Sequence, residues 1–258
     1  MNPSVGRRSL GLHGANRAIW PAVWFALLML CVWGFPHADG VLRSLEPDAN
    51  QVVYQRASLA SLLLQHLFVV SVAAVVTIVG GVLAAIAVTR EGGRDFLPMV
   101  AQVASLGQTF PPVAVLALAV PALGFGTLPI IVALVLYGML PIVRNTLGGL
   151  QDVDKDIKSA AIAMGMTPWQ VLRQVELPLA APVILAGIRT SVTINISTAA
   201  IGATVGARNL GDPIIAGIVN GNMAYIVQGA LTIALLALTV DSLFERFQER
   251  LRSRLYTS

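Results

Sequence analysis

The residue types that usually carry catalytic or metal chemistry are sparse in this sequence. His13, His37 and His66 are far apart on different predicted segments and do not have the spacing of metal ligands. The phosphate-binding motif GxxxxGK[ST] does not occur, so the chain lacks the usual nest of backbone amides for ATP. The single cysteine, Cys31, excludes an intramolecular disulfide. We therefore expect no catalytic residue, no metal site and no bound cofactor, and we do not expect the chain to be an enzyme.

Polar residues inside apolar segments are the better candidates for function. Gln108 and Thr109 come directly before a Pro-Pro break, which frees carbonyl groups that protein or a water-lined cavity must satisfy. Ser191 and Asn195 are four residues apart in another apolar segment and would share one helix face. These four residues are candidates for lining a solute pathway. The alternatives are a simple packed kink and hydroxyl groups that serve helix packing. For the nearby Arg189, structural pairing or snorkelling is favoured over solute contact.

A second polar stretch, residues 151–178 (QDVDKDIKSAAIAMGMTPWQVLRQVELP), is far longer than a hairpin connection needs to be. Residues 157–164 favour a helix, and Gly165 permits a turn. Thr167, Pro168 and Gln170 predict the start of a second helix, which should stop before Pro178. Small residues at Ser159, Ala160 and Ala161 allow another surface to approach closely. The pattern predicts a docking helix, with an unpartnered loop helix as the alternative.

The composition indicates the environment of these segments. Hydrophobic residues make up 56% of the 258 residues and charged residues only 12%, against about 25% in a typical soluble domain. The mean hydropathy is +0.76. The net charge of +4 does not indicate a nucleic-acid partner, because the basic residues are scattered between apolar segments. We expect the partner surface to be the lipid bilayer.

Six apolar segments are long enough to cross a bilayer, which takes roughly 20 residues. The first could instead be a signal peptide, but it is long, rich in Trp and without a clear cleavage site, so a retained helix is favoured. The third is interrupted by Pro111 and Pro112, and the fourth contains Pro141. The predicted fold is an all-α integral membrane protein with six transmembrane helices at residues 18–35, 59–89, 97–124, 128–149, 181–205 and 225–243.

Basic residues predict the orientation of these helices. If the N-terminus is inside, the outer segments hold only Arg43, Arg56 and Arg208. The cytoplasmic segments then hold thirteen basic residues, and this bias predicts that both termini are cytoplasmic. The expected organisation is a cytoplasmic N-terminus (1–17), a first helix (18–35), a periplasmic segment (36–58), a core (59–243) and a cytoplasmic tail (244–258). The thirteen residues are Arg7, Arg8, Arg17, Arg90, Arg94, Arg144, Lys155, Lys158, Arg173, Arg246, Arg250, Arg252 and Arg254.

The stretch Ser159-Ala160-Ala161, Gly165 and Val175-Glu176-Leu177-Pro178 resembles the EAA loop of ABC importer permeases. This resemblance implies the type I permease fold and a coupling helix that docks on a cytoplasmic ATPase. ATP and Mg²⁺ would be bound by that partner. The sequence departs from the family at Ser159, where Glu is usual, and at Val175, where Ile is common. The implied coupling residues are Ser159, Ala160, Ala161, Gly165, Thr167, Leu177 and Pro178.

Four other stretches resemble the osmoprotectant permeases, which serve glycine betaine, choline and carnitine uptake, and most of all the low-affinity betaine type of enteric bacteria. They are residues 107–112, 136–141, 185–192 and 205–211, the last with Arg208 and Asn209 in place of the commoner small residues. A quaternary ammonium ion is held best by aromatic faces, but the core has few aromatics, with Phe110, Phe125 and Tyr137 as the exceptions. The resemblance therefore implies that strong selection of the solute resides in a separate extracytoplasmic binding protein. Phe110 and Tyr137 are further candidates for lining the pathway. The resemblance implies three partners: ATPase subunits, a second permease subunit of the same or another kind, and a periplasmic binding protein.

Two other functions fit the sequence. The chain could be a permease for another small solute such as an amino acid, with the same coupling machinery. It could also be a membrane scaffold or sensor that does not transport. Neither the solute nor the identity of the second permease follows from the residues.

Overall fold

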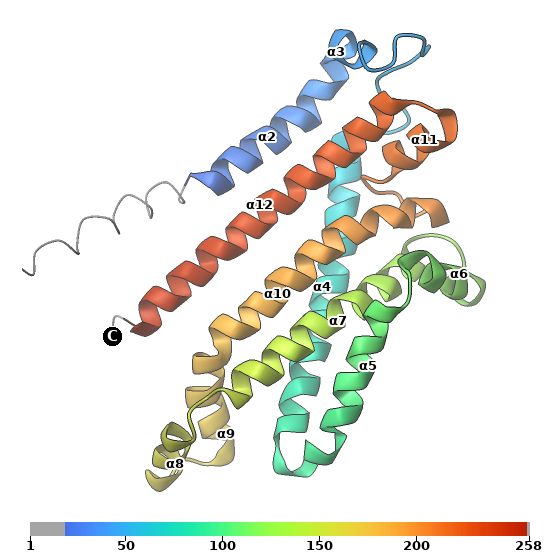
Figure 1. The fold of residues 1–258 in the computed structure, drawn as a ribbon. Coiled ribbons are helices and arrows are strands. Elements are labelled where there is room, and N and C mark those ends of the chain that lie inside the picture. Colours follow the sequence, from blue (N-terminus) through green and yellow to red (C-terminus); the bar gives the residue numbers. More distant parts are fainter. Residues whose placement is uncertain (1–18, 257–258) are drawn as a thin grey trace, which may run out of the picture.

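The computed structural model describes residues 19–256, which form helices and their connections without any strand in that range. Long helices run side by side, with short helices gathered at both ends of the bundle (Figure 1). The predicted all-α membrane fold is confirmed. The expectation of a cytoplasmic N-terminus, with Arg7, Arg8 and Arg17, falls on residues 1–17, outside the described residues.

The first and last long helices pack along each other. Helix α2 (Trp20–Gly34) continues into the short helices η1 (Phe35–His37) and α3 (Asp39–Arg43). Helix α12 (Met223–Tyr256) runs beside α2 (Figure 1). It is longer than the predicted span of residues 225–243, because the charged tail continues the same helix. The two helices form one side of the bundle.

The centre of the bundle consists of α4 (Leu59–Thr89), α7 (Thr127–Gln151) and α10 (Leu177–Ala199). Helix α4 has the predicted bounds, and Ser58 caps it by accepting a hydrogen bond from the amide of Ser61. Helix α7 accommodates Pro141 within its length. All three helices contribute to one apolar core, which includes the fully buried Leu62, Leu134 and Ile196. Burial of these aliphatic side chains fixes the relative positions of the three helices.

The predicted third span is a broken helix. After η2 (Glu91–Phe96), α5 (Leu97–Thr109) and α6 (Pro112–Leu123) meet at an angle of 99°. Pro111 and Pro112 have no N–H groups to continue the helix, and the residue before each proline is extended. Each half is only about 20 Å long, less than the roughly 30 Å of a hydrocarbon core. Neither half can cross a membrane alone.

Two contacts show that the broken pair carries the chain from one end of the bundle to the other. Arg90, directly after α4, pairs with Glu176 at 2.7 Å, directly before α10, so α4 and α7 end at the same end of the bundle. The amide of Gly126, before α7, donates to the carbonyl of Val205, after α10, at 2.8 Å. Helix α7 therefore begins at the opposite end from α8, and the α5–α6 pair counts as one crossing. With the five long helices this makes six crossings within residues 19–256.

The end where α10 finishes, hereafter the α11 end, contains elements that the sequence did not predict. The predicted fifth span, residues 181–205, is α10 followed by the 3-10 helix η4 (Ala200–Val205), and α10 begins four residues earlier than expected. A loop then leads to α11 (Asp212–Asn220), a short helix that packs on α12 (Figure 1). Asn222, after α11, donates from Nδ2 to the carbonyl of Gln51 at 2.7 Å and so ties the two loops together.

The opposite end, hereafter the α8 end, holds α8 (Lys155–Ala163), α9 (Pro168–Val171) and the π-helical turn η3 (Leu172–Glu176). The prediction that the second loop helix stops before Pro178 is wrong, because α9, η3 and α10 follow one another without a break. In the π-turn the Leu177 amide donates to the carbonyl of Leu172, five residues earlier, and this change of hydrogen-bond register directly before Pro178 accommodates a residue that has no N–H. Proline is therefore tolerated at this position.

Candidate coupling surface and solute pathway

The turn between α8 and α9 has the predicted local structure. Gly165 has φ +87°, a left-handed conformation that other residues rarely adopt, and it ends α8. The amides of Gly165 and Met166 donate to the carbonyls of Ile162 and Ala161, which is a Schellman motif. Thr167 and Gln170 form a complete capping box at the start of α9. The helix–turn–helix prediction is confirmed.

These two helices present an exposed apolar surface. Ser159 and Ala160 are exposed, whereas Ala161 is buried, with 2% of its surface exposed. Sequence reasoning did not identify four large apolar side chains beside them as coupling residues, although exposed hydrophobic residues in a polar loop were a signal. They are Ile157, Ile162, Met164 and Trp169. Of the other predicted coupling residues, Gly165 and Thr167 are exposed, and Leu177 and Pro178 are half-buried at the base of α10. We define the coupling surface as Ile157, Ser159, Ala160, Ile162, Met164 and Trp169.

A buried carboxylate anchors the coupling surface to the helix bundle. Glu176 is 5% exposed and pairs with Arg90 at 2.7 Å and with Lys158 at 3.2 Å. Lys158 also donates to the carbonyl of Leu150 at 2.9 Å, so it links α8 to the end of α7. The three charged residues border a cleft of about 1150 Å³ between α8, α9 and η2. The cluster therefore links α8 to the adjoining ends of α4, α7 and α10.

Sequence reasoning did not identify this ion-pair cluster, because its members lie far apart along the chain. Glu176 stands between the apolar residues Val175 and Leu177, and a lone acid in such a position could have indicated a buried carboxylate with a cationic partner. Its cationic partners come from another loop and from α8, and only the fold brings them together.

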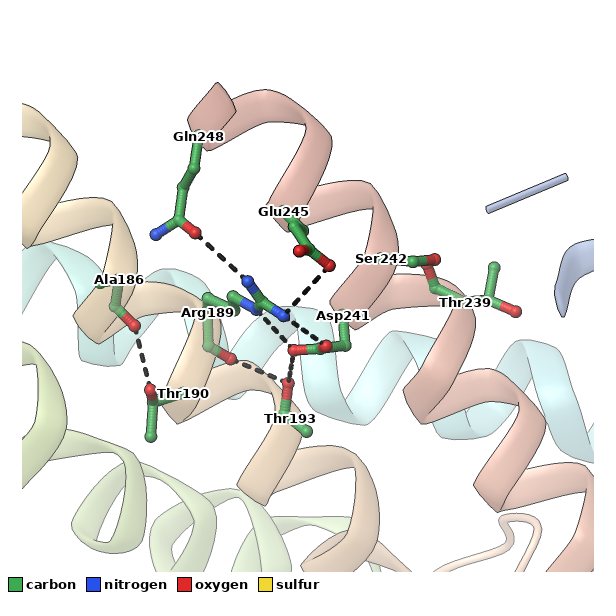
Figure 2. Close-up of polar contacts among 9 residues, drawn as sticks. All are labelled: Ala186, Arg189, Thr190, Thr193, Thr239, Asp241, Ser242, Glu245 and Gln248. Carbon is green, nitrogen blue, oxygen red and sulfur yellow. Dashed lines mark hydrogen bonds and ion pairs between the residues drawn. The ribbon is translucent and has the colours of Figure 1, made fainter. Parts of the chain in front are cut away.

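Arg189 is held by a second ion-pair cluster (Figure 2). Its guanidinium forms a two-pronged pair with Asp241 of α12, with Nε–Oδ1 and Nη2–Oδ2 distances of 2.6 Å. Glu245 lies 3.7 Å from Nη2, and Gln248 accepts from Nη1 at 3.4 Å. Thr193, one turn along α10, donates to Asp241 at 3.5 Å. The interpretation of Arg189 as a structural pairing residue is confirmed, and the cluster fastens α10 to α12.

Four of the predicted pathway residues meet at the break between α5 and α6. Gln108 donates from Nε2 to the backbone carbonyl of Tyr137 at 3.0 Å. The Tyr137 hydroxyl donates in turn to the carbonyl of Phe110, which is one of the groups that the break leaves without a helical partner. Gln108, Thr109 and Phe110 are exposed, and Tyr137 is buried in α7. The break is therefore braced by α7.

The other two pathway candidates, Ser191 and Asn195, are fully buried at the contact between α10 and α7. A Cβ added to Gly138 would lie 2.5 Å from Ser191 Oγ and 3.0 Å from Asn195 Nδ2, so this glycine allows the close helix contact. Thr77 of α4 completes the contact. Neither the Ser191 hydroxyl nor the Asn195 amide has a hydrogen-bond partner among the described residues. Tyr137 and Gly138 of α7 thus contact Gln108, Phe110, Ser191 and Asn195, and the role of all six candidates in a pathway stays a prediction.

The sequence of this chain matches a family model. The model is described as "Binding-protein-dependent transport system inner membrane component", and it covers residues 78–255, more than half of the chain. The chain belongs to this family. It is a permease subunit, a multi-pass inner membrane component of an ABC importer, and the functional class predicted from the sequence is confirmed.

Curated relatives of this permease carry osmoprotectants. The osmoprotectant import permease protein OsmY of Salmonella typhimurium is 40% identical over 87% of this chain and 90% of its own length. The glycine betaine/carnitine/choline transport system permease protein OpuCB of Bacillus subtilis is 38% identical over 69% of this chain and 81% of its own length. Both support the resemblance that the sequence motifs indicated.

Solved structures show the same fold. The inward-facing MetNI methionine ABC transporter aligns with a TM-score of 0.66 at 22% identity, over 75% of this permease and 95% of the matched chain. An amino acid ABC transporter solved with histidines aligns with a TM-score of 0.61 at 20% identity, over 74% and 93%. The type I importer permease fold is confirmed.

Proposed function

We propose that this permease moves an osmoprotectant such as glycine betaine across the inner membrane, driven by ATP hydrolysis on a partner ATPase. The observation that carries the choice of solute is the 40% identity to an osmoprotectant import permease across nearly the whole chain. An amino acid as the solute is the second candidate, and only the general fold of the solved neighbours favours it.

The coupling surface is the proposed docking site for the ATPase, which would bind ATP and Mg²⁺. Its exposed apolar side chains, such as Ile162 at 62%, Met164 at 76% and Trp169 at 66%, suit burial against another protein. Two ATPase subunits, a second permease copy or paralogue, and a periplasmic binding protein complete the proposed importer. In this arrangement the α8 end and both termini are cytoplasmic, as the basic residues predict.

The ion pairs of Glu176 support a route for the coupling. When the ATPase subunits close, they would move α8 and α9 together, and Glu176 would transmit the motion to α4 and α10. Separation of α10 from α7 would then expose Ser191 and Asn195. Their unpaired polar atoms in this apolar surrounding support a second arrangement, since such groups are costly to leave without partners.

The test of the proposed solute is uptake into proteoliposomes that contain the permease with its own ATPase and binding protein. Radiolabelled glycine betaine should accumulate only with ATP, and excess choline or carnitine should compete. Competition by amino acids in place of these compounds would favour the second candidate. A scaffold or sensor would show neither uptake nor solute-stimulated ATP hydrolysis.

The docking role predicts a specific defect. Ile162→Asp places a charge in the coupling surface and should lower uptake and ATPase co-purification at least tenfold, because an unpaired charge would be buried on docking. Val41→Asp in the short helix α3 is the control for an exposed apolar residue outside both the coupling surface and the membrane-crossing helices, and it should leave ATPase binding unchanged. Normal binding and uptake in a well-expressed Ile162→Asp permease would refute the docking surface.

A further inference from the structure

The α11 end contains a pocket of about 370 Å³, at the opposite end of the bundle from the coupling surface. It opens between the loop before α4, the end of η4 and the short helix α11. This volume falls within the usual range for small-molecule sites. We call it the α11-end pocket, and its chemically informative lining residues are Tyr54, Arg56, Arg208 and Asp212, with Ile215 and Val219 as apolar neighbours.

The pocket brings one acid, one aromatic ring and two guanidinium groups together. Asp212 is half-buried, and burial raises the pKa of its carboxyl, whereas the Asn209 amide and Arg208 lower that pKa. Arg56 and Arg208 are exposed, and within the described residues neither they nor Asp212 form an ion pair shorter than 4 Å. Opposite charges thus line one small cavity without neutralising one another directly.

Polar clamps hold the walls of the pocket in place. Gln228 of α12 is buried, accepts from the Tyr54 amide at 3.2 Å and donates to the Val52 carbonyl at 2.8 Å. Tyr225 packs edge-on against the Tyr54 ring, with 5.5 Å between ring centroids. On the other wall, the buried Asn209 side chain binds the carbonyls of Ala199 and Ala207 and the Gly211 amide. A pocket with fixed walls loses little entropy when it binds a ligand.

We propose that the α11-end pocket binds a small zwitterion that carries a quaternary ammonium group and a carboxylate. The Tyr54 ring and the Asp212 carboxylate would hold the cation, and Arg56 and Arg208 would hold the carboxylate. The inference rests on the proposed function. It adds a solute site on the permease itself, at the end where solute would arrive from the binding protein.

A docking contact with the binding protein is the competing explanation for the two arginines. Acidic side chains on a partner could pair with Arg56 and Arg208, but such a contact would not require the half-buried Asp212 or the Tyr54 ring. Choline and glycine betaine distinguish the two explanations, because both contain a quaternary ammonium group and only glycine betaine carries a carboxylate.

The test is equilibrium binding of radiolabelled glycine betaine and choline to the permease–ATPase complex in nanodiscs, without a binding protein. Asp212→Asn should weaken the binding of both solutes about tenfold, since it removes the anion that faces the cation. Arg208→Gln should weaken glycine betaine about tenfold and leave choline within twofold. Tyr54→Phe should keep the affinity, and Tyr54→Leu should lower it for both solutes.

Arg43→Gln is the matched control, because Arg43 lies at the same end, outside the pocket, and pairs with Asp39. It should change neither affinity. Monodisperse gel-filtration profiles and choline binding by Arg208→Gln show that the variants are folded.

Two results would overturn the pocket. One is absence of solute binding to the wild-type complex while the full importer still transports glycine betaine, in which case the proposed function stands and the site is wrong. The other is an Arg208→Gln permease that loses glycine betaine and choline uptake equally, and only when the binding protein is present. That result would indicate that Arg208 contacts the binding protein and not the solute. Failure of the full importer to transport any osmoprotectant would refute the proposed function instead, and the binding assay would still test the pocket by itself.

Discussion

At the residue scale, Glu176 differs from the other acidic groups because it is buried and shared by two cations. Glu176→Gln keeps the side-chain volume but leaves Arg90 and Lys158 without their anion. Both cations are partly exposed, so water will compensate in part, and we expect a loss of about 1–3 kcal/mol in the stability of this end. The loss of uptake should be larger than the decrease in stability alone would cause, because the same contacts connect α8 to the bundle. Proteoliposome uptake and thermal denaturation of the purified permease measure the two effects.

The exposed pair Arg43–Asp39 provides the comparison for Glu176. Its side chains are 46% and 58% exposed, and surface pairs contribute about 0–1 kcal/mol. Asp39→Asn should therefore change neither uptake nor melting temperature measurably. If Glu176→Gln behaves like Asp39→Asn, the buried cluster has no part in coupling.

At the scale of elements, the break between α5 and α6 depends on a side chain of α7. The Tyr137 hydroxyl satisfies the Phe110 carbonyl, and Tyr137→Phe leaves that carbonyl without this partner. We expect a loss of about 1–3 kcal/mol and lower uptake. Thermal denaturation and uptake assays check this prediction.

Tyr225→Phe is the control, because the Tyr225 ring packs on Tyr54 and no hydrogen bond of the Tyr225 hydroxyl is seen in the described part of the chain. Equal effects of the two substitutions would contradict the bracing role.

The same elements show what sequence can and cannot predict here. Helix α4 was predicted with its observed bounds, because a long apolar run lies between a capping serine and an arginine. The Pro-Pro break and the capping box at Thr167 were also predicted, since proline and capping chemistry act locally. Helix α11 was missed because nine residues form a helix mainly by packing, and its Gly217 lies against Ile226 of α12.

Position and partners explain the remaining differences. A proline in the sequence is compatible both with the end of one helix and with the start of the next, so Pro178 alone does not predict which occurs. In the structure the π-turn η3 leads directly into α10, which contains Pro178. Ser191 and Asn195 do share one face, as their spacing predicted, but that face packs on Gly138 in this structure. A sequence pattern identifies the face of a helix, and it does not identify which neighbour covers that face.

At the scale of the whole molecule, six crossings place residues 44 and 204 on one side of the membrane and residues 159 and 253 on the other. The Arg90–Glu176 pair and the Gly126–Val205 hydrogen bond fix this arrangement, because they make the bent α5–α6 pair a full crossing. The proposed orientation adds that the first side is periplasmic. Single cysteines introduced into a Cys31→Ala background can test both statements, because Cys31 is the only native thiol.

We expect a membrane-impermeant maleimide to label Ser44→Cys and Thr204→Cys in intact spheroplasts, because both positions are exposed at the α11 end. Ser159→Cys and Ser253→Cys, also exposed, should react only after permeabilisation. Expression of the permease without its ATPase prevents shielding of position 159. If the reagent labels Ser159→Cys and Ser253→Cys in intact spheroplasts and leaves Ser44→Cys and Thr204→Cys unlabelled, the proposed orientation is the reverse of the true one. A different result would contradict the six-span arrangement: labelling of Ser253→Cys and Ser44→Cys in intact spheroplasts, with Ser159→Cys protected. The two ends of the chain would then lie on opposite sides of the membrane, which requires an odd number of crossings.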